Sequence, residues 1–213
     1  MSEERIQTEL VKLLVSAHPD YIAVTAQTGI LPVILPELYE CTEAAAITEN
    51  TLENLRRLAP DKSLRLAALL LALGEKQATA ALRRLKFDND TISRTGRLIR
   101  WHDWEFPQTP VGVRRALNKT GSEIFPQLLE FQSTARDVGR LPHLYREVLD
   151  SNQCFTLKQL AITGSDLIAQ GMPPGKPIGL CLAACLDDVL THPEHNTQAY
   201  LLQLALSGEA VKN

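Results

Sequence analysis

Seven residues rich in glycine and proline, from Gly171 to Pro177, join two apolar stretches near the C-terminal end of the chain. Pro177 suits the first turn of the second stretch, where a backbone N–H would be unpaired in any case, and Gly171 suits the end of the first stretch. The pattern predicts a helix–hairpin–helix whose second helix begins with free N–H groups beside Lys176. Such a helix start favours an anion, above all phosphate. Two interpretations stay open: a plain structural corner, or a phosphate contact through Gly175 and Lys176.

Positive charge gathers in the middle of the chain. Residues 83–119 carry nine basic and four acidic side chains, whereas residues 1–82 and 120–213 each have a net charge of −4. A basic surface is the electrostatic footprint of nucleic-acid binding, although a solvated protein face gives the same pattern. The basic side chains that could contact phosphate are Arg83, Arg84, Lys86, Arg94, Arg97, Arg100, Arg114, Arg115 and Lys119.

The helix expected over residues 90–102 indicates how some of these cations are presented. At about 100° per residue, its apolar side chains fall on one side of the helix, and Arg94, Arg97 and Arg100 fall together on the opposite side. We expect the apolar side to pack on the core and the three arginines to face outward.

Other reactive side chains form no recognisable catalytic set. His192 and His195 are separated by Pro193, which interrupts the helix that would align them, so a surface turn is expected rather than a metal pair. No serine, histidine and aspartate stand in a nucleophile-elbow context, and no glycine-rich loop is followed by paired carboxylates. Cys181 and Cys185 lie four residues apart on an apolar helix face, which predicts reduced core residues. We therefore expect neither catalytic residues nor a metal site in this chain.

The elements that position these residues are predicted to be helices throughout. Apolar residues make up 45% of the chain and aromatic residues 5%, and runs of β-branched residues are absent. The fold class predicted is all-α, an irregular multi-helix bundle with a C-terminal helix–hairpin–helix. The stretch from Ser63 to Gly74 is apolar nearly all round apart from Arg65, which predicts a central buried helix. Residues expected to begin helices are Ser2, Thr48, Ser63, Thr109 with Pro110, and Ser122.

The weakest joint lies around Gly139–Pro142, which predicts a helical body over residues 1–138 and a helical tail over residues 139–213. The longest apolar run, Leu66–Leu73, is too short to cross a membrane, and the acidic N-terminal segment has no apolar signal core. These features predict a cytoplasmic protein.

A long motif in the tail is similar to a known family. The segment "LKQLAITGSDLIAQGMPPGKPIGLCLAACLDDVLTHPEHNTQAYLL" resembles the C-terminal region of bacterial tRNA CCA-adding nucleotidyltransferases and the related poly(A) polymerases. The N-terminal "SEERIQTELVKLLVS" is similar to the segment that follows the neck of these enzymes. The family pattern L-x-I-x-G-x-D-L-I-x-x-G-x-x-P-G-x-x-I-G, followed by P-x-x-N, is matched by Leu160, Ile162, Gly164, Asp166, Leu167, Ile168, Gly171, Pro174, Gly175, Ile178, Gly179, Pro193 and Asn196.

The resemblance implies that catalysis belongs to segments that precede this sequence in the family. The family uses a β-sheet head with a G-G-x-V-R-D motif and a magnesium-binding acidic pair, and a neck that pairs with CTP or ATP. Many relatives also carry a His-Asp metal hydrolase module, but Leu71 and Ala72 stand at its His-Asp positions and Glu75 replaces its lysine. His102 and Asp103 alone cannot build such a site. We expect no metal chemistry here.

Together these observations predict the tRNA-binding body and tail of a CCA-adding nucleotidyltransferase, which holds the acceptor and T arms for a head and neck in the same or another polypeptide. The candidate RNA contacts are the nine basic residues above, Gly175 and Lys176. Two alternatives stay open: a stand-alone RNA-binding adaptor, and a structural or dimerising module that binds no RNA.

Overall fold

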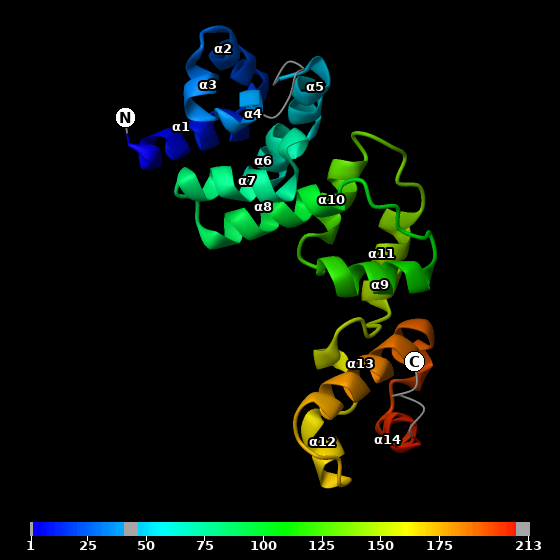
Figure 1. Ribbon diagram of the computed structural model, residues 1–213. Helices are drawn as coiled ribbons and strands as arrows, with labels where there is room; N and C mark the ends of the chain where they lie inside the picture. Colours follow the sequence, from blue (N-terminus) through cyan, green and yellow to red (C-terminus); the bar gives the residue numbers. More distant parts are fainter. Residues whose placement is uncertain (1, 41–46, 208–213) are drawn as a thin grey trace. The chain divides into compact units, whose positions relative to one another are not determined.

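The computed structural model describes residues 2–40 and 47–207, and these residues form helices and connecting segments without a β-strand (Figure 1). The all-α prediction is therefore confirmed. No helix in these two ranges is long and apolar enough to cross a membrane. Cys41 lies outside the described residues.

The chain divides into two compact units. Unit 1 comprises residues 1–104 and 123–138, and unit 2 comprises residues 105–122 and 139–213. One crossing between the units falls at 138–139, the position of the predicted boundary. The segment 105–122 belongs to unit 2, where its helix α9 (Pro110–Thr120) packs against α11 (Leu141–Asp150) and α13 (Lys176–Thr191).

Unit 1 is built around one buried helix, α6 (Lys62–Leu70), whose residues from Ser63 to Leu70 are all buried. The other elements of unit 1 are α1 (Glu3–Val15), η1 (Pro19–Tyr21), α2 (Ile22–Gln27), α3 (Ile30–Ile34), α4 (Glu37–Glu40), α5 (Glu49–Arg57), η2 (Leu71–Leu73), α7 (Gly74–Arg84), α8 (Asn89–Trp101) and α10 (Phe125–Gln132). The central helix α6 packs against α1, α5, α8 and α10.

The central helix confirms the prediction of a buried element but begins earlier than expected. Asp61 caps α6 by accepting a hydrogen bond from the Leu64 amide, and Ser63 lies inside the helix. The one cation of α6, Arg65, is 5% exposed and donates to the carbonyl oxygens of Leu14 and Leu58. Burial is therefore compensated by hydrogen bonds, as a buried charge requires.

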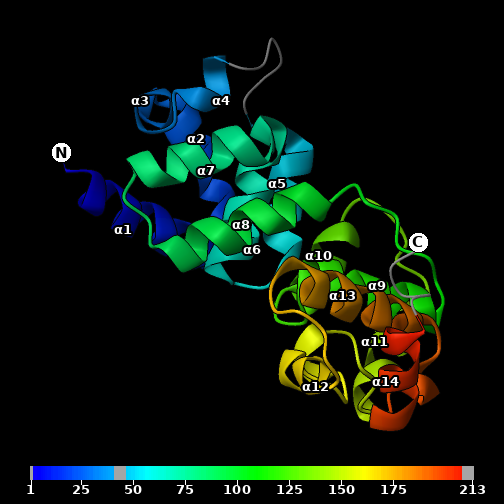
Figure 2. The same ribbon diagram turned by 60° about the horizontal axis from the view of Figure 1, so that its bottom comes forward.

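Helices α7 and α8 form a hairpin of unit 1 and lie side by side in both views (Figure 2). Gly96 of α8 permits their close approach, because a Cβ atom at this position would lie 2.8 Å from Cγ2 of Thr79 on α7. Asp88 caps α8 through the amide and hydroxyl of Thr91.

Unit 2 is centred on α13 (Lys176–Thr191), which packs against α9, α12 and α14. The predicted apolar face of α13 is buried, including the free thiols of Cys181 and Cys185. Its other elements are α9 (Pro110–Thr120), α11 (Leu141–Asp150), η3 (Leu157–Gln159), α12 (Gly164–Ala169), η4 (Pro193–His195) and α14 (Gln198–Leu206).

Most predicted helix starts agree with the structure. Thr48 and Thr109 cap α5 and α9 with their side chains, and Ser2 occupies the N-cap position of α1 without a side-chain hydrogen bond. The prediction at Ser122 was wrong, because α10 begins at Phe125 with Ile124 at the N-cap position.

Candidate nucleic-acid interface

The glycine–proline joint is the turn between α12 and α13 in unit 2. The preceding helix α12 begins with a capping box, in which Thr163 and Asp166 exchange side-chain and backbone hydrogen bonds. Gly164 lies close to the second helix, since a Cβ there would be 3.1 Å from Cγ2 of Ile178. The motif residues Thr163–Asp166 thus fix where α12 starts and how near it lies to α13.

The turn itself depends on two glycines with left-handed backbone. Gly171 has φ +90° and Gly175 has φ +113°, conformations that a side chain disfavours. The Met172 amide donates to the Leu167 carbonyl and closes the end of α12. The joint is therefore a defined structural corner, which is the first of the two interpretations that the sequence left open.

The first turn of α13 also has the features that the second interpretation requires. Gly175 stands at the N-cap position and provides no side-chain cap. Lys176 is exposed and has no hydrogen-bond or ion-pair partner among the described residues. Gly179 is exposed as well, and a Cβ atom there would meet nothing within 4 Å. Backbone and cation are thus accessible together at the positive end of a 16-residue helix.

Asn196, the last residue of the family-like pattern, connects two segments of unit 2. Its side-chain oxygen accepts from the Ala161 amide at 2.8 Å, and its Nδ2 donates to the Gln159 carbonyl at 2.9 Å. This asparagine therefore holds the segment before α12 against the turn that follows α13. Its role is structural.

The basic residues of unit 1 are largely paired with acids from elsewhere in the sequence. Arg84 binds both carboxylate oxygens of Glu37 at 2.8 Å. Arg100 binds Glu75 through two hydrogen bonds of 2.6 and 2.7 Å. Lys86 pairs with Glu4 at 2.6 Å, Arg97 with Glu123 at 2.7 Å, and Arg94 donates to Gln127.

These pairs show that the three arginines of α8, which we expected to face outward, are each held by a neighbouring side chain. Arg94 and Arg97 are only partly exposed, and Arg97 and Arg100 are held by carboxylates. Arg83 differs from them: it is exposed and has no partner in the described part of the chain. It lines an open groove between α7 and α8, together with Glu75, Thr79, Asn89, Ile92, Ser93, Gly96, Arg97 and Arg100.

The basic residues of α9 lie in unit 2 and differ in burial. Arg114 is 3% exposed and donates to the Leu190 carbonyl at 2.7 Å and to the side chain of Gln153. Burial lowers the pKa of Arg114. The expectation that Arg114 could contact RNA is therefore corrected, because its buried guanidinium is used to hydrogen-bond a carbonyl near the C-terminal end of α13. Arg115 is exposed and pairs with Asp187 at 3.2 Å, and Lys119 is exposed near the end of α9.

The segment similar to a metal hydrolase holds no cluster of metal-binding side chains in the described residues. Leu71 lies in the 3₁₀ segment η2, and Glu75 is bound to Arg100. His102 is 4% exposed, contacts the Phe131 ring with a ring-centroid distance of 4.3 Å, and bonds through Nδ1 to Asp103 at 2.7 Å. His102 is accordingly a residue of the unit 1 core.

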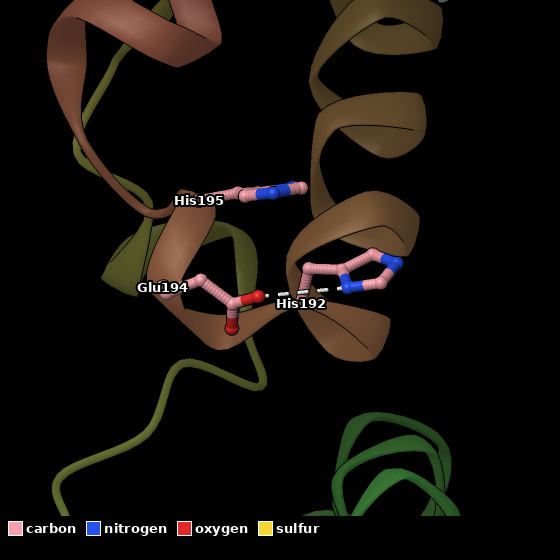
Figure 3. Close-up of side chains that lie close together, drawn as sticks. All are labelled: His192, Glu194 and His195. Atoms are coloured by element: carbon pink, nitrogen blue, oxygen red, sulfur yellow. Dashed lines mark ion pairs between the residues drawn. The ribbon is translucent and has the colours of Figure 1, made fainter.

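The turn after α13 is a surface turn, as its sequence predicted, but its side chains lie closer together than that prediction assumed. Pro193 does end the helix, but the following 3₁₀ turn brings His192, Glu194 and His195 together (Figure 3). One ligand atom from each lies within 4.8 Å of the others, and this is the only such triad among the described residues. The sequence argument assumed that only a continuous helix could align the two histidines.

Comparison with known proteins gives two family matches. Residues 59–205 match the family described as "tRNA nucleotidyltransferase domain 2 putative". Because this match spans more than two thirds of the 213 residues, it decides the family. The chain belongs to the tRNA nucleotidyltransferase family. Residues 1–41 match "Probable RNA and SrmB- binding site of polymerase A". No curated protein and no solved structure gives a match.

The two matches cover the parts of this nucleotidyltransferase chain on which the candidate interface is built. The longer one contains α6–α13 and α14 except its last residue, with the α7–α8 groove in unit 1 and the α12–α13 turn in unit 2. The shorter one contains α1–α4. The chain thus corresponds to the C-terminal, RNA-binding body and tail of the CCA-adding and poly(A) polymerase enzymes, as its motifs predicted.

Proposed function

We propose that this chain holds tRNA by its acceptor and T arms, so that the 3′ end reaches a head domain that adds nucleotides. The head and neck act from the same or another polypeptide, in the cytoplasm. Magnesium and CTP or ATP would be bound by those segments, and this chain would supply neither the metal ligands nor the nucleotide site.

The pair of family matches carries the proposal. One match names tRNA nucleotidyltransferase and the other an RNA-binding site of a polymerase, and together they span most of the chain. The folded RNA of the acceptor and T arms is an A-form duplex, which proteins grip by shape and by phosphate and 2′-hydroxyl contacts. Contacts of this kind need exposed cations and free backbone N–H groups, not a catalytic constellation.

The start of α13 supports the proposal at the level of residues. A phosphate oxygen can approach the uncapped first turn, with Lys176 beside it and no side chain on Gly175 or Gly179 to block the backbone. Helix N-termini bind phosphate through both their N–H groups and their dipole. In α13 the Lys176 amide provides the N–H, because Pro177 has none and the Ile178 amide donates to the Gly175 carbonyl.

The α7–α8 groove of unit 1 supports it independently. Three arginines, Arg83, Arg97 and Arg100, line this groove against one acid, Glu75. The guanidinium of Arg83, which has no partner in residues 2–40 and 47–207, can bind a phosphate without breaking an existing pair. Arg100 would have to exchange its two hydrogen bonds with Glu75 for phosphate, a change that geometry permits because both groups are bidentate acceptors for arginine.

The test is tRNA binding by the full chain at two salt concentrations, for the wild type, Arg83→Glu and Lys176→Glu. We expect affinity to fall with salt, because phosphate binding releases counterions. Each variant should bind more weakly and reduce the slope of log K against log salt by about 1 or more.

Arg146→Glu is the matched control. Arg146 is exposed on α11 beside Glu147 and Asp150, so it undergoes the same charge change in acidic surroundings. This variant should bind tRNA like the wild type. If the chain does not bind tRNA at low salt, or if all three variants weaken equally, the proposal is wrong and the module acts as a scaffold.

A further inference from the structure

The turn between α13 and α14 contains a cluster of metal-ligand side chains that the proposed RNA contacts do not involve. His192 follows α13 directly, and Glu194 and His195 lie on the 3₁₀ turn η4 (Figure 3). Glu194 Oε1 lies 3.6 Å from Nδ1 of His192, and the two imidazole rings stack with centroids 4.8 Å apart. Two imidazoles and one carboxylate are therefore held together within four residues.

His195 is oriented by a second carboxylate. Its Nδ1 hydrogen-bonds Oδ2 of Asp188 at 2.8 Å, and its ring stacks on Tyr200 with a centroid distance of 4.1 Å. With Nδ1 donating to Asp188, Nε2 carries the lone pair that a metal needs. A carboxylate behind a ligating histidine is the usual outer partner in metal sites, where it fixes the tautomer and raises the basicity of the ligand.

Rotation of exposed side chains is needed to bring these ligand atoms around one cation, because the lone pairs of stacked imidazoles do not converge. Ligand atoms about 2.0–2.1 Å from a tetrahedral zinc ion are about 3.4 Å apart, compared with at most 4.8 Å here. The side chains of His192 and Glu194 are 51% and 68% exposed, so their rotamers are free to change. Asp188 and Glu194 offset the charge of a divalent cation, against the positive charge of nearby Arg114.

We propose that His192, Glu194 and His195 bind one divalent transition metal ion of the zinc class, with Asp188 as the residue that positions His195. Two imidazoles and one carboxylate suit zinc and its neighbours rather than magnesium or calcium, which prefer oxygen ligands. The bound ion would link the end of α13 to the turn that carries Asn196. It would stabilise unit 2.

Isothermal titration calorimetry of the full chain with Zn²⁺ in a weakly coordinating buffer tests this site. We expect one ion per chain for the wild type and loss of that binding in the double variant His192→Ala/His195→Ala. Glu194→Gln should weaken binding. Asp188→Asn should weaken it about 10–100-fold, the usual cost of changing a residue that hydrogen-bonds a ligating histidine. Thermal unfolding should show stabilisation by Zn²⁺ in the wild type and not in the double variant.

Two controls separate this site from other zinc ligands. His143→Ala removes an exposed histidine that lies beside Glu147 and Asp150, and it should leave zinc binding unchanged. Cys41→Ser excludes capture of zinc by that thiol, and it too should bind like the wild type. The proposal is overturned if the double variant binds zinc as the wild type does, or if the wild type does not bind it.

Discussion

The effect of Gly179→Ala on stability and on RNA binding should have opposite signs. Gly179 lies in the first turn of α13, is exposed, and has no atom within 4 Å of the position that a Cβ would take. Its backbone is helical, so alanine fits without strain. Glycine costs about 0.8–1.0 kcal/mol relative to alanine inside a helix. We therefore expect Gly179→Ala to stabilise the chain by up to about 1 kcal/mol.

Gly96→Ala is the matched comparison, because both glycines are in helices and only their surroundings differ. A Cβ at Gly96 would lie 2.8 Å from Cγ2 of Thr79 and 3.4 Å from Cγ of Glu75. Thr79 is β-branched and stiff at χ1, so α7 and α8 must move apart. Overpacking costs about 1–3 kcal/mol, which exceeds the gain of about 1 kcal/mol in helix propensity. The expected net loss is about 1 kcal/mol.

Urea denaturation of the two variants at equal m-values measures the stability effects, and tRNA titration at low salt measures the binding effect. Gly179→Ala should bind tRNA more weakly although it is more stable, since its methyl group lies where backbone and phosphate would meet. If Gly179→Ala is no more stable than the wild type, the argument from free space around this residue is refuted. If tRNA affinity stays unchanged, the first turn of α13 is not a contact.

Three further substitutions test individual contacts. Asp88→Ala removes the cap of α8 and should cost about 1 kcal/mol at neutral pH. Hydrogen bonds from Thr91 and then from Lys62 hold the pKa of Asp88 well below its usual value. The cost should therefore be present above pH of about 4 and shrink as the pH falls below it, which urea denaturation at several pH values would reveal. Arg114→Met leaves buried carbonyls unpaired and should cost about 1–3 kcal/mol, whereas the exposed Arg115→Met should cost less than about 1 kcal/mol in the same assay.

The helices of this chain could be predicted because local signals determine them. Apolar periodicity identified α6 and α13 as core helices, and Thr109 with Pro110 marked the start of α9. The error at Ser63 arose because two nearby residues can cap the helix. Asp61 stands two residues before Ser63, and its carboxylate accepts a hydrogen bond from the Leu64 amide, so Asp61 and not Ser63 caps α6. Such competition is decided by the backbone path into the helix, which neighbouring packing sets.

The sequence could not predict which basic residues are free to contact phosphate, because their acidic and carbonyl partners are distant in the sequence. Arg84 pairs with Glu37, 47 residues away, and Arg114 reaches the carbonyl of Leu190, 76 residues away. A count of charges along the chain contains no information on such pairing. The motif around the α12–α13 turn was more informative, since its glycines and its capping residues act locally.

The pairing of the cations also changes what kind of RNA grip is physically reasonable. If all ten predicted cations, the nine basic residues of 83–119 and Lys176, contacted phosphates, the slope of log K against log salt would be near −9 by the relation for duplex DNA. In the described residues only two of the predicted cations, Arg83 and Lys176, have no partner. Two phosphate contacts give a slope of about −2. A measured slope near −2 would mean that the carboxylate pairs of Arg84, Arg97 and Arg100 persist on RNA; a much steeper slope would mean that phosphate displaces these carboxylates, so that binding rearranges the surface of unit 1.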